Sequence, residues 1–234
     1  MIEEIDIETY LFISKDKFQL FIFDKKKLKN LYNEAYIPDS EFNFHDTSSL
    51  SKFLDENIFK IEKLTGHFIK DIILIIENDK NLIIDVGIKK KNYENSINQK
   101  FLENSLSELK DLFQESFQDQ LIMHMVVTNY IINEKQYSSF IRDIASDHLY
   151  LEVNFKTISK DLVSLMNKVL EKFQIKIKYF VSGNYLKEFF SHKKIELSEM
   201  AFKLKNGENQ NEVIVIPKTI ENKGFFEKFF QLFS

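Results

Sequence analysis

The chain has 234 residues, of which 44% are hydrophobic and 29% are charged, with a formal net charge of -4, and this balance is typical of a folded protein. Its 32 basic residues include one arginine, Arg142, and they cluster only in the triplets 25–27 and 89–91, so we expect no nucleic-acid partner. The absence of cysteine excludes disulfides and thiolate metal sites, and it agrees with a reducing, cytoplasmic compartment.

The N-terminal sequence MIEEIDIE is acidic and lacks the apolar stretch of a secretory signal. No segment approaches the ~20 apolar residues that a membrane-spanning helix needs. Any membrane contact is therefore expected to be peripheral, at the inner face of the cell membrane.

The first third of the chain predicts three short strands, at 10–14, 18–23 and 31–37, followed by a helix from about 48 to 65. Thr47 or Ser48 is expected to cap the start of this helix, and Gly66 to end it in a left-handed conformation. Two further strands are expected at 69–76 and 82–88.

A long helix is predicted at 96–117, and a long strand at 121–132. The clearest strand pattern is LYLEVNFKTI, residues 149–158, in which apolar and polar residues alternate. A helix at 162–173, a strand at 175–181 and a short helix at 185–190 follow, and 201–204 could pair with 213–216 as a hairpin. Strands alternating with helices, some in hairpins, predict a mixed α/β (α+β) fold.

Three segments, in the same order, resemble the FtsA family of bacterial cell-division proteins. They are KLTG running into FIKDIILII (63–76), LIMHMVVTNYIINEKQ (121–136), and the segment from LYLEVNFKTI to NYLKEFF (149–190). Members of that family are actin-like proteins that carry a small subdomain inserted into the first actin-type subdomain. The resemblance covers the chain from residue 5 to about residue 190.

The resemblance implies a partial actin-like (ribonuclease H-like) subdomain made from residues 1–69 and 159–216. Residues 70–158 would form the inserted strand and helix subdomain, and residues 217–234 a linker with an amphipathic C-terminal helix. The function implied is that of an adaptor in cell division, binding other division proteins through the inserted subdomain. Direct FtsZ binding is doubtful, because the family's FtsZ-binding region lies in the half that this chain lacks.

The phosphate-binding motifs of the family are missing from this sequence. Where the family has Asp-Ile-Gly-Thr/Ser, this chain has the residues Phe12, Ile13, Ser14, Lys15 and Asp16. There is no glycine that would let the backbone adopt an open conformation, and Phe12 stands where the family has a carboxylate. The string IIDVG at 83–87 imitates the second motif but continues into isoleucine and lysines, so Asp85 is interpreted as a strand residue. We therefore expect no bound nucleotide, no cofactor and no enzymatic activity.

The five histidines are scattered, and no pair has the i, i+4 spacing of a helical metal site. His124, in the middle of a predicted strand, is interpreted as a packed or hydrogen-bonded structural residue. The sequence identifies no catalytic residue and no metal ligand.

The last ten residues hold five phenylalanines. If they form a helix, six apolar side chains fall on one side of it: Phe225, Phe226, Phe229, Phe230, Leu232 and Phe233. Three interpretations remain open for these residues: packing on the chain's own domain, contact with a membrane surface, and binding to a partner protein or a second copy. Two alternative functions also remain open, an actin-like ATP-binding protein and an assembly protein of a pilus or secretion system built on the same plan.

Overall fold

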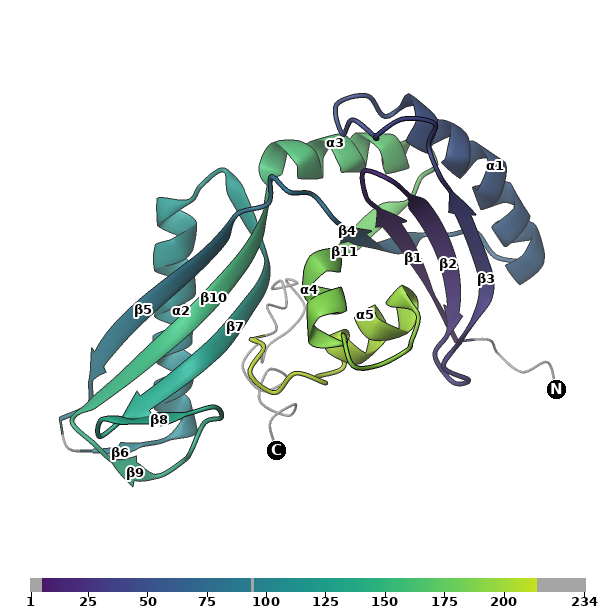
Figure 1. Cartoon of the computed structure of the whole chain (residues 1–234). Coiled ribbons are helices and arrows are strands. Elements are labelled where there is room, and N and C mark those ends of the chain that lie inside the picture. Colours follow the sequence, from purple (N-terminus) through teal and green to yellow (C-terminus); the bar gives the residue numbers. More distant parts are fainter. Residues whose placement is uncertain (1–5, 94, 214–234) are drawn as a thin grey trace. The chain divides into compact units, whose positions relative to one another are not determined.

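The computed structural model describes residues 6–93 and 95–213, which form two compact units (Figure 1). Unit 1 comprises residues 6–80 and 160–206. Unit 2 comprises residues 81–159 and 207–213. The chain therefore leaves unit 1 after its fourth strand, builds most of unit 2, and returns to complete unit 1.

A five-stranded mixed sheet forms the centre of unit 1, in the order β11-β4-β1-β2-β3. The first three strands pair antiparallel in sequence order, whereas β4 is parallel to both β1 and β11. The strand bounds are β1 Ile7–Ile13, β2 Phe18–Asp24, β3 Lys29–Tyr36, β4 Asp71–Ile76 and β11 Lys176–Ser182.

Helices pack on both faces of this sheet, which explains why every residue of β2 is buried. Both α1 and α5 contact β2, while α3 and α4 contact β11 (Figure 1). Large aromatic side chains fill this core, among them Tyr10, Phe18, Phe21 and Phe23. The helix bounds are α1 Ser48–Thr65, α3 Lys160–Glu171, α4 Gly183–Phe189 and α5 Leu197–Lys205.

An antiparallel sheet in the order β5-β10-β7-β8 forms unit 2, and one helix, α2, packs on one of its faces. The buried face of β10 carries Leu149, Leu151, Val153 and Phe155, and the Phe155 ring stacks on Phe113 of α2 at 4.1 Å between centroids. The bounds are β5 Ile83–Lys91, β6 Ser96–Ile97, α2 Gln99–Ser116, β7 Gln120–Ile132, β8 Lys135–Tyr137, β9 Ile144–Ala145 and β10 His148–Ser159.

Two boundaries differ from those expected. Residues 71–76 belong to unit 1, because β4 pairs with β1 and β11, so the excursion into unit 2 begins near residue 81 rather than residue 70. Residues 207–213 belong to unit 2 rather than to unit 1, where residues up to 216 were expected. Apolar runs such as 72–76 do not reveal which sheet they join, since that depends on pairing partners distant in the sequence.

The expected hairpin of 201–204 with 213–216 is wrong for its first strand, because residues 201–204 lie inside α5. The buried residues of α5, Ser198, Ala201 and Leu204, follow one another at helical spacing, which was missed. The backbone of Val213 donates instead to the carbonyl of Met125 in β7. Residues 214–216 lie outside the described residues.

The ends of α1 were predicted in part. Gly66 ends the helix at φ 72°, in the left-handed region, as expected. Thr47 occupies the N-cap position but makes no capping bond through its side chain. Asp46 supplies that contact instead, because its Oδ1 accepts from the backbone N–H of Ser48 at 3.1 Å.

The predicted fold class is confirmed. The chain is a mixed α/β protein in which a five-stranded unit is interrupted after β4 by a small antiparallel unit. The sheet of unit 1 has parallel strands at one edge and an antiparallel meander at the other.

Candidate functional site

The turn between β1 and β2, residues 14–17, is where the family resemblance would place a phosphate loop. Ser14 closes this turn, since its backbone N–H donates to the Lys17 carbonyl at 2.9 Å and its Oγ accepts from the backbone N–H of Asp16 at 3.3 Å. None of the residues 14–17 has a positive φ. The turn is therefore a tight hairpin whose Ser14 and Asp16 amides are already bonded, rather than an open anion cradle.

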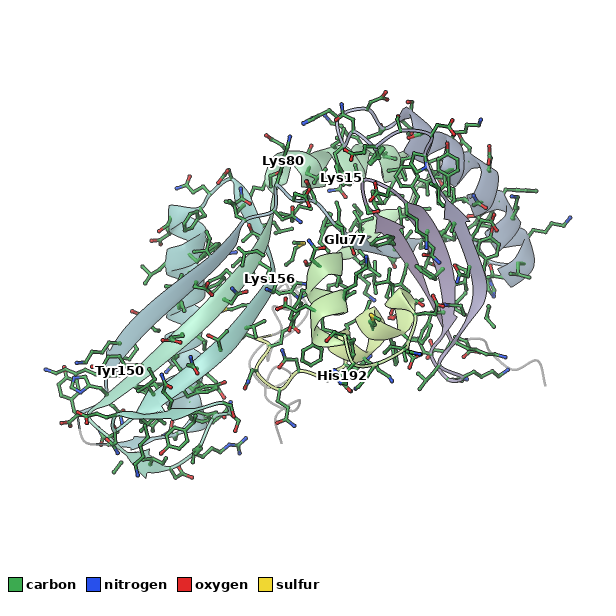
Figure 2. The ribbon with its side chains drawn as sticks, in the orientation of Figure 1. Lys15, Glu77, Lys80, Tyr150, Lys156 and His192 are labelled. Carbon is green, nitrogen blue, oxygen red and sulfur yellow. The ribbon has the colours of Figure 1, made fainter. Side chains whose placement is uncertain are left out.

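Side chains of β1, α4 and the segment after β4 lie beside this turn, and that of Lys187 is half-exposed. Phe12 is 2% exposed, and Lys187 of α4 lies over its ring with the ammonium nitrogen 5.2 Å from the centroid. The same ammonium forms an ion pair with Oε1 of Glu77 at 2.5 Å, without hydrogen-bond geometry. Lys15, on the turn itself, forms an exposed ion pair with Asp79, which raises the pKa of the Lys15 ammonium. Figure 2 labels Lys15 and Glu77.

Gly183 allows the close approach of two strand ends in this region. A Cβ atom at residue 183 would lie 2.6 Å from Cγ of Glu77, nearer than such atoms can pack. The carboxylate of Glu77 thus lies directly against the start of α4. Together with Lys187, it fills the carboxyl-terminal edge of β4 and β11.

Unit 2 contains a small pocket between α2 and β7, which we call the α2–β7 pocket. Its volume is about 200 Å³. That is below the roughly 300–1,000 Å³ of typical small-molecule sites, so its size suits one or two side chains of a bound peptide. The lining residues are Gln99, Leu102, Glu103 and Leu106 from α2, Val127 and Tyr130 from β7, Ser139, Phe140 and Arg142 from the loop after β8, and Gln210, Asn211 and Val213.

The lining of this pocket is mixed, with apolar, polar and charged side chains. Partial desolvation raises the pKa of the Glu103 carboxyl, and the nearby Gln99 and Arg142 oppose that shift. Burial raises the pKa of the Tyr130 hydroxyl to about 12. Arg142, the one arginine of the sequence, is exposed and lines the pocket. The pocket therefore combines apolar side chains with one basic and one acidic group.

The segment 211–213 forms one wall of the pocket by adding to the edge of β7. Val127 donates its backbone N–H to Asn211 at 2.9 Å, and Val213 donates to Met125 at 2.7 Å, in an antiparallel arrangement. On this strand edge His124, 5% exposed, contacts Glu212 through Nδ1 and Oε1 at 2.6 Å. This contact confirms the interpretation of His124 as a structural, hydrogen-bonded histidine.

The face of the unit 2 sheet that points away from α2 is polar. Asp85 accepts from the amide of Asn154 at 2.7 Å, which fits its interpretation as a strand residue. Lys89 lies over the ring of Tyr150, which Figure 2 labels, with the ammonium nitrogen 4.9 Å from the centroid. These side chains contact one another across neighbouring strands.

The predicted contact residues Phe225, Phe226, Phe229, Phe230, Leu232 and Phe233 lie outside the described residues. Within residues 6–93 and 95–213, no cluster of three or more His, Asp or Glu side chains could hold a metal ion. Over the same residues, no helix is both long and apolar enough to cross a bilayer. Sequence reasoning missed the α2–β7 pocket, because its walls come from segments up to about a hundred residues apart.

Comparison with known proteins finds no matching family model and no matching curated protein. Solved structures give weak resemblances only. The chain is similar to the PilM–PilN type IV pilus biogenesis complex at 8% identity and a TM-score of 0.48, covering 78% of this chain and 49% of that chain. It is similar to the cytoplasmic domain of EpsL, an inner membrane component of the type II secretion system of Vibrio cholerae, at 9% identity and a TM-score of 0.35, covering 76% and 57%.

A Bacteroides thetaiotaomicron protein described as having an actin-like ATPase fold and unknown function is 16% identical, with a TM-score of 0.32 and coverage of 83% of this chain and 61% of that chain. The chain thus spans about half to three fifths of the length of these solved structures.

Proposed function

We propose that this chain is a non-enzymatic adaptor of partial actin-like fold, which binds partner proteins through unit 2 and a membrane surface through Phe225–Phe233. One observation carries the proposal: the β1–β2 turn is closed and its surroundings are filled by Phe12, Glu77 and Lys187, whereas unit 2 offers an open pocket. Nucleotide chemistry needs free amides and space beside the phosphates.

The setting proposed for the adaptor is bacterial cell division, on the residues that resemble the FtsA family. Assembly of a pilus or secretion system remains the alternative setting for the same adaptor role. The two differ in their partners rather than in their chemistry. The genes that neighbour the one for this chain would separate them.

The membrane contact proposed for the C-terminal segment is weak for a single copy. Lys218, Lys223 and Lys228 are the basic residues near its apolar side, and each contributes only ~1 kcal/mol of attraction to an anionic surface. An isolated helix shorter than about 12 residues is also marginal in water, so the segment would have to fold on binding. Stable attachment therefore needs several copies acting together.

Flotation with vesicles containing anionic lipid tests this proposal. We expect the full chain to float when its copies are held together by a fused oligomerisation tag. A chain ending at Asn222 with the same tag should stay with the protein fraction. Phe230→Asp should abolish flotation, while Lys228→Asp on the polar side should only weaken it. Equal behaviour of the tagged full chain and the tagged shortened chain would overturn the membrane role.

A further inference from the structure

We infer that the C-terminal aromatic segment, residues 224–233, docks in the α2–β7 pocket of its own chain when no membrane is present. This deepens the proposed function, because the same phenylalanines would then serve either the pocket or the lipid surface. Docking would hide the membrane-binding residues until lipid competes for them.

The size and chemistry of the pocket favour an aromatic anchor over a free ligand. Its volume of about 200 Å³ is too small for most small molecules and is suited to one or two aromatic side chains. Leu106 and Val127 provide apolar walls, and Phe140 from the loop after β8 is only half-buried. An inserted ring could complete the packing of these side chains.

Continuity of the chain favours this occupant over a foreign peptide. Val213, which lines the pocket, is the last described residue before the segment, and its backbone is tied to Met125 of β7. About a dozen residues separate Val213 from Phe225, and an extended chain of that length reaches up to ~40 Å. A short tether of this kind gives an effective concentration in the millimolar range.

The charges agree with the same arrangement. Arg142 and Glu103 line the pocket, one of each sign. If the segment is helical, Glu227 and Lys228 fall on the side opposite its phenylalanines. Each charge of the segment therefore has a residue of opposite sign in the pocket lining, which would orient the docked segment without adding much affinity.

Hydrogen exchange in buffer without lipid tests the inference. Backbone amides of Gln99–Leu106 and of Ser139–Arg142 should exchange about tenfold more slowly in the full chain than in a chain ending at Asn222. This factor is expected for a site with a dissociation constant of ~0.1 mM when the tethered segment has an effective concentration of ~1 mM. Adding the peptide 223–234 to the shortened chain should restore the protection. Phe230→Asp in the full chain should abolish it, whereas the matched change Lys228→Asp should leave most of it.

Two outcomes would overturn the inference. The first is equal exchange of these amides in the full and shortened chains. The second is protection that grows with protein concentration between about 1 and 100 µM, which would place the segment in the pocket of a second copy. Vesicle flotation reads out the membrane role separately, so docking can fail while the adaptor proposal stands, and the reverse also holds.

Discussion

Gly183, which has no side chain, allows Glu77 to approach closely, and this approach positions two strand ends of unit 1. Glu77 follows β4 and Gly183 follows β11, and the two approach so closely that a methyl group at residue 183 would overlap Cγ of Glu77. The approach places the carboxylate of Glu77 beside the ammonium of Lys187, and that ammonium covers Phe12. The filled edge of the sheet thus depends on a glycine at this position.

Gly183→Ala should therefore lower the free energy of unfolding by about 1–3 kcal/mol, the usual range for forcing an extra methyl group into a packed site. Gly87→Ala is the matched control, because a Cβ at residue 87 meets no atom within 4 Å. Urea denaturation measures both, and Glu77→Ala should rescue much of the loss. If Gly183→Ala were as harmless as Gly87→Ala, the close approach would be wrong.

Because the Tyr130 hydroxyl is buried, we expect the free energy of unfolding to fall at high pH. Burial raises the pKa of its hydroxyl to about 12 in the folded chain, against about 10 in an unfolded one. The stability that depends on the neutral hydroxyl is therefore complete below pH ~10 and is lost as the pH rises towards 12, by about 2–3 kcal/mol.

Comparing Tyr130→Phe with the parent chain isolates this effect from the titration of lysines and of Tyr10, whose pKa burial also raises. The unfolding free energy of the variant should fall less steeply between pH 10 and 12. Tyr150→Phe, at an exposed ring, is the control and should follow the parent curve. Identical slopes for all three chains would contradict the burial of the Tyr130 hydroxyl.

At the scale of single elements, two helix starts that look alike in sequence differ in the structure. Asn98 caps α2 through its side chain, which accepts from the backbone N–H of Phe101 at 3.0 Å. Thr47 holds the same position before α1 without such a bond. Asn98→Ala should therefore cost about 1 kcal/mol, and Thr47→Ala much less. Urea denaturation of both variants checks the difference, and equal losses would contradict the assigned caps.

Helices and strands were predictable where the local sequence pattern was strong. They were less predictable where pairing with distant segments determines the position of an element in the fold. The alternation at 149–158 matches β10, and Gly66 ends α1, because side-chain direction and backbone freedom are local properties. Long-range pairing decides which sheet β4 joins. It also decides the contact between His124 and Glu212, which are 88 positions apart in the sequence. The helix at 197–205 was mistaken for a strand because a short apolar pattern fits both periods.

On the scale of the whole molecule, the side chains of Phe12, Glu77 and Lys187 lie at strand ends of unit 1, where the family resemblance would place a phosphate loop. The mixed α/β class and a separate inserted strand and helix unit were expected from the sequence, whereas the parallel pairing of β4 and the helix α5 were not. The α2–β7 pocket was not, since it needs α2, β7 and residues 210–213 to meet in three dimensions. The proposed adaptor role rests on the contrast between a closed turn in unit 1 and an open pocket in unit 2.

Thermal unfolding with and without Mg-ATP tests this contrast most directly. A ligand present at 100 times its dissociation constant stabilises a folded protein by about 2.7 kcal/mol, which for a chain of this size raises Tm by roughly 5–10 °C. With its β1–β2 turn closed, the chain should show a shift of less than about 1 °C at millimolar Mg-ATP. A saturable shift of several degrees that Lys15→Ala or Lys187→Ala removes would contradict the account.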